Sequence, residues 1–213
     1  MKGIKNIIFD LGAVLLNLDM ERTDAAFAEL VGDEAEHAWI RKELYKKELF
    51  TKFETNEVLE LEFVQTIKAY NPHPLTDEEV RTAWSAMLLD LPEDRIELLR
   101  NLRKAGYKIY LLSNINSIHL RDIYTMIKEV YGDLDFDALF DKPYYSHLIG
   151  RRKPDADTFS YVLEDAGLVA AETLFIDDNA RNIKAAAALG IQTIHFKNPD
   201  QLKADLISKG IRI

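Results

Sequence analysis

Polar side chains able to do chemistry stand at the ends of several short apolar runs, or in the loops that follow them. They are Asp10, the pair Ser113 and Asn114, Lys153 before a proline, and the pair Asp177 and Asp178. If the runs are parallel strands, their carboxyl ends meet at one edge of a sheet, where open α/β sheets bind ligands. We therefore expect these residues to converge on one crevice.

The combination of side chains predicts the chemistry of that crevice. Three carboxylates repel one another unless a cation lies among them. An all-oxygen site suits Mg²⁺, which a substrate phosphate completes, and a lysine and a serine hydroxyl can hold phosphate oxygens. The set indicates phosphoryl transfer through an aspartyl-phosphate. Asp10 would attack phosphorus, Mg²⁺ would offset the repulsion between the two anions, and water would hydrolyse the intermediate.

An alternation of strands and helices is predicted to position these residues. We expect strands at 4–9, 109–112, 143–146, 174–176 and 192–196. We expect helices from Pro92 to Gly106, at 118–130, 155–166 and 180–189, and from Pro199 onward. Strands that alternate with helices of this length are typical of βαβ units and a parallel sheet.

Residues from about 20 to 90 have a different pattern, rich in Glu, Lys, Leu and Ala at helical spacing. They contain no convincing strand and predict three or four helices. Thr76 and Glu79 form a capping box at the start of one of them. We expect Trp39 and Trp84 to lie in the core of this helical insert.

The overall composition argues against several classes of binding partner and of chemistry. A net charge of −9 argues against a general nucleic-acid binder, and the absence of cysteine excludes disulfides and thiol catalysis. The N-terminus does not look like a signal peptide, and no apolar stretch reaches the ~20 residues of a membrane span. We expect a cytoplasmic protein, a monomer or weak homodimer, that binds a small phosphorylated substrate and neither nucleic acid nor membrane.

Four segments resemble the four sequence motifs of the haloacid dehalogenase superfamily. They are residues 9–14, 111–114, 152–154 and 175–179, and they occur in the order and spacing of that family. The resemblance covers essentially the whole chain. It implies an α/β fold, with a Rossmann-like parallel sheet core (1–15 and 91–213) flanked by helices and an inserted all-helical cap (16–90).

Within the superfamily the chain looks most like the α-D-glucose-1-phosphate phosphatase group. It is also similar to the phosphatase domain of soluble epoxide hydrolases. The run from Ser113 to Asn116, followed by His119, supports this placement.

The resemblance implies a set of metal ligands. Asp10 would be both the nucleophile and a ligand of Mg²⁺, together with the backbone carbonyl of Gly12 and the carboxylate of Asp178. Asn182, one helical turn beyond Asp178, would support that carboxylate from behind.

The resemblance also implies how the phosphoryl group is held. Ser113, Asn114 and Lys153 would bind it. Asp177 would orient a metal-bound water or Lys153.

Gly12 departs from the family pattern, because most phosphatases of the superfamily have an aspartate there that protonates the leaving group. Such general acid help contributes about 10²–10⁴-fold. One explanation is a good leaving group, such as the anomeric hydroxyl of a sugar 1-phosphate, and the glucose-1-phosphate group resembles this chain in having glycine there. The other is that Asp19 or His119 supplies the proton. Asn116 is a further candidate for substrate contact, although Asp19 could simply cap a helix and His119 lie on a helix surface.

Two other functions are open at this point. Asp10 could attack carbon in a metal-free hydrolytic dehalogenation, although the superfamily's dehalogenases lack this dense acidic site. The loss of the second aspartate could also mark a degenerate phosphatase that only binds a ligand. Retention of Asp10, Lys153 and Asp178 argues against the latter, because a binding module has no need of a nucleophile.

Overall fold

A parallel sheet forms the centre of the molecule. The computed structural model describes residues 3–213, so the first two residues of the predicted core lie outside the described part. The strands run in the order β3-β2-β1-β4-β5, and every neighbouring pair is parallel. They are β1 (Asn6–Phe9), β2 (Lys108–Ser113), β3 (Lys142–Tyr145), β4 (Thr173–Asp177) and β5 (Gln192–His195). The predicted α/β fold with a parallel sheet is confirmed.

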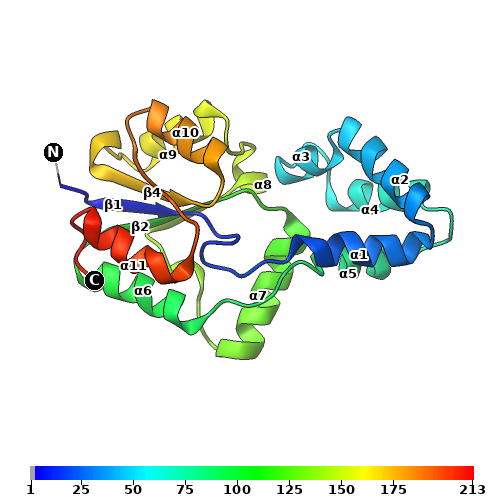
Figure 1. The fold of residues 1–213 in the computed structure, drawn as a ribbon, viewed down its shortest axis with the longest axis horizontal. Coiled ribbons are helices and arrows are strands. Elements are labelled where there is room, and N and C mark those ends of the chain that lie inside the picture. Colours follow the sequence, from blue (N-terminus) through cyan, green and yellow to red (C-terminus); the bar gives the residue numbers. More distant parts are fainter. Residues whose placement is uncertain (1–2) are drawn as a thin grey trace.

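Helices cover both faces of this sheet (Figure 1). On one face lie α6 (Glu93–Lys104), α7 (Ser117–Tyr131) and α11 (Pro199–Ser208), and on the other α9 (Ala156–Asp165) and α10 (Ala180–Ala188). Side chains alternate across the sheet: Ile7 and Phe9 pack in the first layer and Ile8 in the second. Burial on both faces explains why the strands read as nearly continuous apolar runs. Short elements complete the core, namely η1 (Asp137–Leu139), α8 (Ser146–Ile149) and η2 (Ala170–Glu172).

The segment between β1 and α6 forms the helical cap. Its helices are α1 (Met20–Val31), α2 (Glu34–Lys46), α3 (Leu49–Glu54), α4 (Glu60–Tyr70) and α5 (Asp77–Ser85). The prediction of three or four helices is wrong, because Met20–Ser85 contains these five, with α2 and α3 as a separate pair. Glu48 between them adopts a left-handed backbone with φ 56°, and no glycine or proline marks the break in the sequence. None of the helices within 3–213 has the length and apolar character needed to cross a bilayer.

The cap has a hydrophobic cluster of its own, which includes Leu44, Phe63 and Val80. Trp84 packs against this cluster, as expected. The prediction for Trp39 is wrong, because that side chain is 54% exposed and the next residue, Ile40, is buried instead. The capping box of Thr76 and Glu79 is present at the start of α5.

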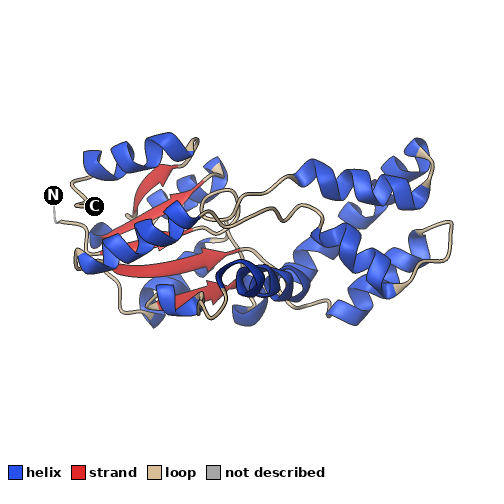
Figure 2. Cartoon of the chain, turned by 90° about the horizontal axis from the view of Figure 1, so that it is seen from below, coloured by secondary structure: helices blue, strands red, loops and turns tan. Residues whose placement is uncertain are grey.

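Two loops connect the cap to the core (Figure 2), one from β1 and one leading to α6, and they bind each other. Leu18 and Leu88 form an isolated antiparallel bridge. Beside it, the Asn17 N–H donates to the Asp90 carbonyl at 2.8 Å and the Asp19 N–H to the Met87 carbonyl at 2.9 Å. The segment that enters the cap and the segment that leaves it are therefore held together by hydrogen bonds.

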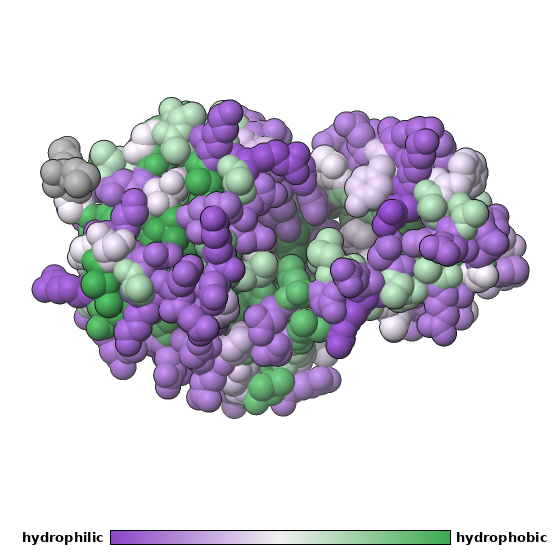
Figure 3. All heavy atoms as spheres, viewed as in Figure 1, coloured by the Kyte–Doolittle hydropathy of each residue, from purple (hydrophilic) through white to green (hydrophobic). Residues whose placement is uncertain are grey.

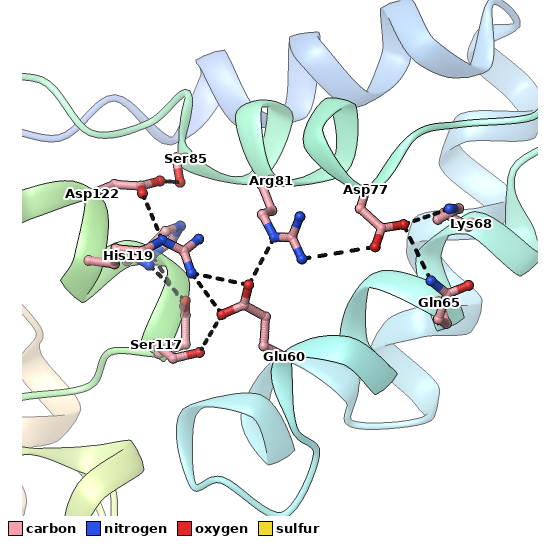
Figure 4. A network of polar contacts seen from close by, with 11 residues as sticks. Glu60, Gln65, Lys68, Asp77, Arg81, Ser85, Ser117, His119 and Asp122 are labelled. Carbon is pink, nitrogen blue, oxygen red and sulfur yellow. Dashed lines mark hydrogen bonds and ion pairs between the residues drawn. The ribbon is translucent and has the colours of Figure 1, made fainter. Parts of the chain in front are cut away.

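Helix α7 of the core is a second attachment for the cap. Glu60 of α4 accepts hydrogen bonds from Arg81 of α5 at 2.8 Å and from Arg121 and Ser117 of α7 at 3.0 and 3.2 Å (Figure 4). Ile118 of α7 lies within the cap's hydrophobic cluster. Because α7 begins shortly after the end of β2, the cap is joined to the helix that follows the Ser113 loop.

Candidate active site

Asp10 lies at the point where the strand order reverses. The chain proceeds from β1 to β2 and β3 on one side, and later to β4 and β5 on the other, and such a switch point opens a crevice at the strand ends. The Asp10 N–H donates to the Ile176 carbonyl at 2.9 Å, which extends the ladder between β1 and β4. The Leu11 N–H then donates to Asp10 Oδ1 at 2.7 Å, which fixes the carboxylate.

Lys153 connects Asp10 to the end of β4. Its Nζ lies 2.7 Å from Asp10 Oδ1 and 2.7 Å from Asp177 Oδ2. The three side chains are buried, with the Lys153 residue only 1% exposed, and buried charges of this kind are tolerated only when they are paired. The structure thus brings together the three residues that the sequence predicts as catalytic.

The pKa values in this group follow from burial and charge. Burial raises the pKa of Asp10 to about 7, and Asp177 adds to the rise while Lys153 opposes it. Burial disfavours the charge on Lys153, but Asp10 and Asp177 outweigh it and hold the pKa of the ammonium above its usual value. One ammonium therefore does not fully compensate the carboxylates around it.

Asp177 is held by donors on several sides besides Lys153. The Asn182 side-chain amide donates to both of its oxygens at 3.0 Å, and the Asn179 N–H donates to Oδ1 at 2.8 Å. Asn182 therefore supports Asp177, and the prediction that it supports Asp178 is wrong. The reason is that neighbouring residues at a strand end point to opposite sides: Asp177 faces the buried side that α10 covers, and Asp178 is exposed.

Asn114 positions the backbone of the lysine loop. Its Nδ2 donates to the Lys153 carbonyl at 2.8 Å, and its Oδ1 accepts from the Lys153 N–H at 2.8 Å. One N–H of this amide is engaged, so a phosphate contact by Asn114 would use the second side-chain N–H or the backbone N–H. Ser113, the last residue of β2 and the neighbour of Asn114, is 3% exposed. Its contact with phosphate stays a prediction.

The acidic residues fit a divalent cation. Asp10, Asp177 and Asp178 each offer a carboxylate oxygen, and these atoms lie within 4.8 Å of one another. Desolvation and the neighbouring Asp177 charge raise the pKa of Asp178, so the cluster carries excess negative charge. Asp177 already accepts hydrogen bonds from several N–H donors. Asp10 and Asp178 are therefore the better candidates to offer an oxygen to a metal ion. Hard oxygen donors with uncompensated charge suit Mg²⁺, and the Gly12 carbonyl remains the predicted additional ligand.

The residues predicted as acids or substrate contacts, Asp19, Asn116 and His119, make hydrogen bonds or ring contacts within the protein. Asp19 caps α1, accepting from the Glu21 N–H at 3.1 Å, and Asn116 caps α7, accepting from the His119 N–H at 3.0 Å. The expectation that His119 lies on a helix surface is wrong, because it is 7% exposed and stacks on Trp84 with ring centroids 5.0 Å apart.

The ring nitrogens of His119 are both engaged. Nε2 lies 3.0 Å from the Trp84 carbonyl, which can only accept, so Nε2 carries the proton and Nδ1 faces the Asn116 amide at 3.3 Å. Burial lowers the pKa of His119 to about 4. A neutral imidazole held in this way is poorly placed to protonate a leaving group at neutral pH.

An ion pair between cap and core adjoins Lys153, and sequence reasoning missed it. Glu54 of α3 accepts from Arg152 Nε at 3.0 Å, and Arg152 Nη2 lies 2.9 Å from the same carboxylate oxygen. The sequence marks Arg152 only as a neighbour of Lys153. No local pattern links it to Glu54, which belongs to a separate helical segment.

Comparisons with known proteins agree with this geometry. A model of the haloacid dehalogenase-like hydrolases matches residues 4–190. A D-ribitol-5-phosphate phosphatase of Bacteroides thetaiotaomicron is 28% identical over 204 residues, covering 95% of this chain and 97% of that protein.

Solved structures are similar over almost the full length. A haloacid dehalogenase family enzyme of Bacteroides thetaiotaomicron, in complex with magnesium and inorganic phosphate, has a TM-score of 0.80 and 32% identity, covering 95% of this chain and 98% of that one. A predicted hydrolase of this type from Porphyromonas gingivalis has a TM-score of 0.84 and 31% identity, covering 99% and 98% of the two chains. The fold, the strand-end cluster and these matches agree, and the chain belongs to the haloacid dehalogenase-like hydrolases.

Proposed function

We propose that this protein is a Mg²⁺-dependent phosphomonoester hydrolase that acts through a phosphorylated Asp10. The observation that carries the proposal is the position of Lys153, whose ammonium lies 2.7 Å from both Asp10 and Asp177 at the switch point of the sheet. A phosphate there would meet a nucleophile, a cation and a cluster suited to Mg²⁺. The related Bacteroides enzyme, solved with magnesium and inorganic phosphate, supports the proposal.

Each side chain has a proposed role in this reaction. Asp10 attacks phosphorus as the bond from phosphorus to the alkoxide oxygen breaks, and Lys153 neutralises a phosphate oxygen. The alkoxide takes a proton from solvent water, and a water molecule then hydrolyses the phosphorylated Asp10. Asp177 holds Lys153 at the required position, and Asn114 fixes the backbone of the same lysine. A bound Mg²⁺ would keep Asp10 ionised and reduce its repulsion of the phosphate; its proposed ligands are Asp10, Gly12 and Asp178.

For the alcohol part, one of the named relatives suggests a sugar-type phosphate. A relative of similar length is named a D-ribitol-5-phosphate phosphatase, and the resemblance to glucose-1-phosphate phosphatases adds the anomeric phosphate as a finer possibility. These two substrates distinguish the two explanations for the glycine at position 12, a good leaving group or another proton donor. Glucose 1-phosphate has an acidic anomeric leaving group, whereas ribitol 5-phosphate is an ester of an ordinary primary alcohol.

The test is phosphate release with and without Mg²⁺ across sugar 1-phosphates, polyol phosphates, nucleotides and acyl phosphates. Asp10→Asn is expected to lower kcat by about 10⁴-fold or more, as loss of a nucleophile does in other hydrolases. Asp155→Asn, the same change at an exposed residue before α9, is the matched control. Full metal-dependent activity in Asp10→Asn would refute the proposal. Metal-free halide release from 2-haloacids would favour the dehalogenase alternative.

A further inference from the structure

The cap contains a cavity of about 550 Å³ that reaches Arg152, the residue before Lys153. Helices α1 to α5 all contribute to its walls, and Arg152 and Arg181 line it from the core. Figure 3 shows that the molecule is hollowed between its two parts. Because Lys153 follows Arg152 and touches Asp10, a phosphate ester held at Lys153 would have its alcohol part next to this cavity.

The walls of the cavity are largely apolar. Phe27, Phe50 and Trp84 line it and are only partly buried, although they pack against the cap's hydrophobic cluster. Ile40 and Leu44 of α2 line it as well and belong to that cluster. The interior of the cap is therefore incompletely filled, and the unfilled space faces aromatic and aliphatic side chains.

Most charged side chains in the lining are already engaged. Asp24 binds Arg41 at 2.7 Å, and Glu54 binds Arg152 at 2.9 Å. Within residues 3–213, Arg181 is the lining cation for which no ion pair is found. Polar side chains, Thr51 and Arg181 among them, line part of the cavity. Against its aromatic and aliphatic walls, however, the hydroxyls of a sugar would leave water without gaining a new partner, which is unfavourable. An apolar group would lose nothing of this kind.

We propose that the cap cavity receives an apolar alcohol part of the substrate, aliphatic or aromatic, so that the preferred esters are phosphates of hydrophobic alcohols. This inference rests on the proposed phosphatase function and makes its substrate class specific. It predicts that sugar and polyol phosphates bind more weakly than alkyl phosphates of similar size, which differs from the substrate class that the named relative suggests.

Binding of n-alkylphosphonates in the presence of Mg²⁺ tests the inference without turnover. These phosphate mimics cannot lose their alkyl group, and a series from ethyl to octyl extends further into the cavity at each step. Each buried methylene is expected to lower Kd about fourfold until the cavity is filled. The Kd is measured by calorimetry on the wild-type protein. Ribitol 5-phosphate and glucose 1-phosphate, which an active enzyme would hydrolyse, are compared with octylphosphonate on Asp10→Asn.

A filling variant locates the binding. Thr51 of α3 lines the cavity, and Thr51→Trp would occupy part of it. Thr82→Trp is the matched control, because Thr82 is an exposed residue of α5 outside this cavity. We expect Thr51→Trp to flatten the dependence on chain length while ethylphosphonate binding stays unchanged, and Thr82→Trp to behave as wild type.

The outcomes separate the inference from the proposed function. A Kd independent of chain length in the wild type, or tighter binding of the polyol phosphates than of octylphosphonate, would overturn the inference. A chain-length dependence that Thr51→Trp leaves intact would also overturn it, since the alkyl group would then lie elsewhere. Chain-length-dependent binding without phosphate release from any ester would support the inference and refute the phosphatase function alone.

Discussion

The buried imidazole of His119 makes stability depend on pH in a calculable way. In the folded protein its pKa is about 4, because burial disfavours the charged form, whereas an unfolded chain has a pKa near 6.5 for histidine. Between these values the unfolded chain binds more protons, so stability falls as pH falls from 6.5 to 4. A shift of this size corresponds to about 3 kcal/mol.

Replacement by glutamine removes this proton uptake. His119→Gln loses the stacking on Trp84 and part of the hydrogen bonding, so we expect it to be less stable than wild type at neutral pH. On lowering the pH from about 7.5 to about 4.5, the wild type should lose about 2 to 3 kcal/mol that the variant does not lose. The difference in unfolding free energy between the two proteins should therefore shrink, or reverse, by that amount.

Urea unfolding at a series of pH values measures this difference. Other titrating groups, His147 included, are common to both proteins and cancel in the comparison. A difference in stability that stays constant from about pH 7.5 to about pH 4.5 would show that His119 is not buried as a neutral ring. The same result would restore His119 as a candidate acid.

Two further changes test other parts of the structure. Gly12→Asp restores a carboxylate beside the nucleophile; its Cβ would lie 2.7 Å from Leu18 Cδ1, so the leucine tip must move, at a cost of about 1 kcal/mol. We expect kcat for esters of ordinary alcohols to rise by up to about 10²-fold relative to aryl phosphates, and an unchanged ratio would contradict this reasoning. Glu60→Ala leaves Arg81 and Arg121 without their shared partner and should cost about 1 kcal/mol in urea unfolding, less in high salt. The exposed Glu78→Ala is its control, and an equal cost for both would contradict the role of Glu60.

The arrangement of the sheet was predictable because burial on both faces leaves a plain signal in the sequence. The run that ends at Asp10 and the run that ends at Asp177 are nearly continuous apolar runs, and their polar ends lie on the same edge. The meeting of Asp10, Lys153 and Asp177 followed from that geometry. Pro92 and Gly106 likewise marked the flanks of α6, which spans Glu93–Lys104.

Features that depend on the packing of distant segments could not be predicted in this way. Periodicity places His119 on α7 but does not show that the cap covers that part of the helix. It placed Trp39 in the cap core, whereas the packing of α2 exposes Trp39 and buries its neighbour Ile40. Asn182 was assigned to the wrong aspartate because the sequence does not say which of two adjacent carboxylates faces inward.

The central strand also has a consequence for the order of folding. Asn6 of β1 pairs with Lys108 of β2 and with Thr173 of β4. Strand β1 is synthesised first, so it can pair only after these much later residues have been made. Contacts between residues so far apart in sequence form slowly, since a long loop must close before they are gained. During synthesis the helices of the cap can form while Ile7, Ile8 and Phe9 are still unpaired, and an unpaired apolar strand is prone to aggregate. The nucleophile would thus acquire its surroundings only after β4 has been made.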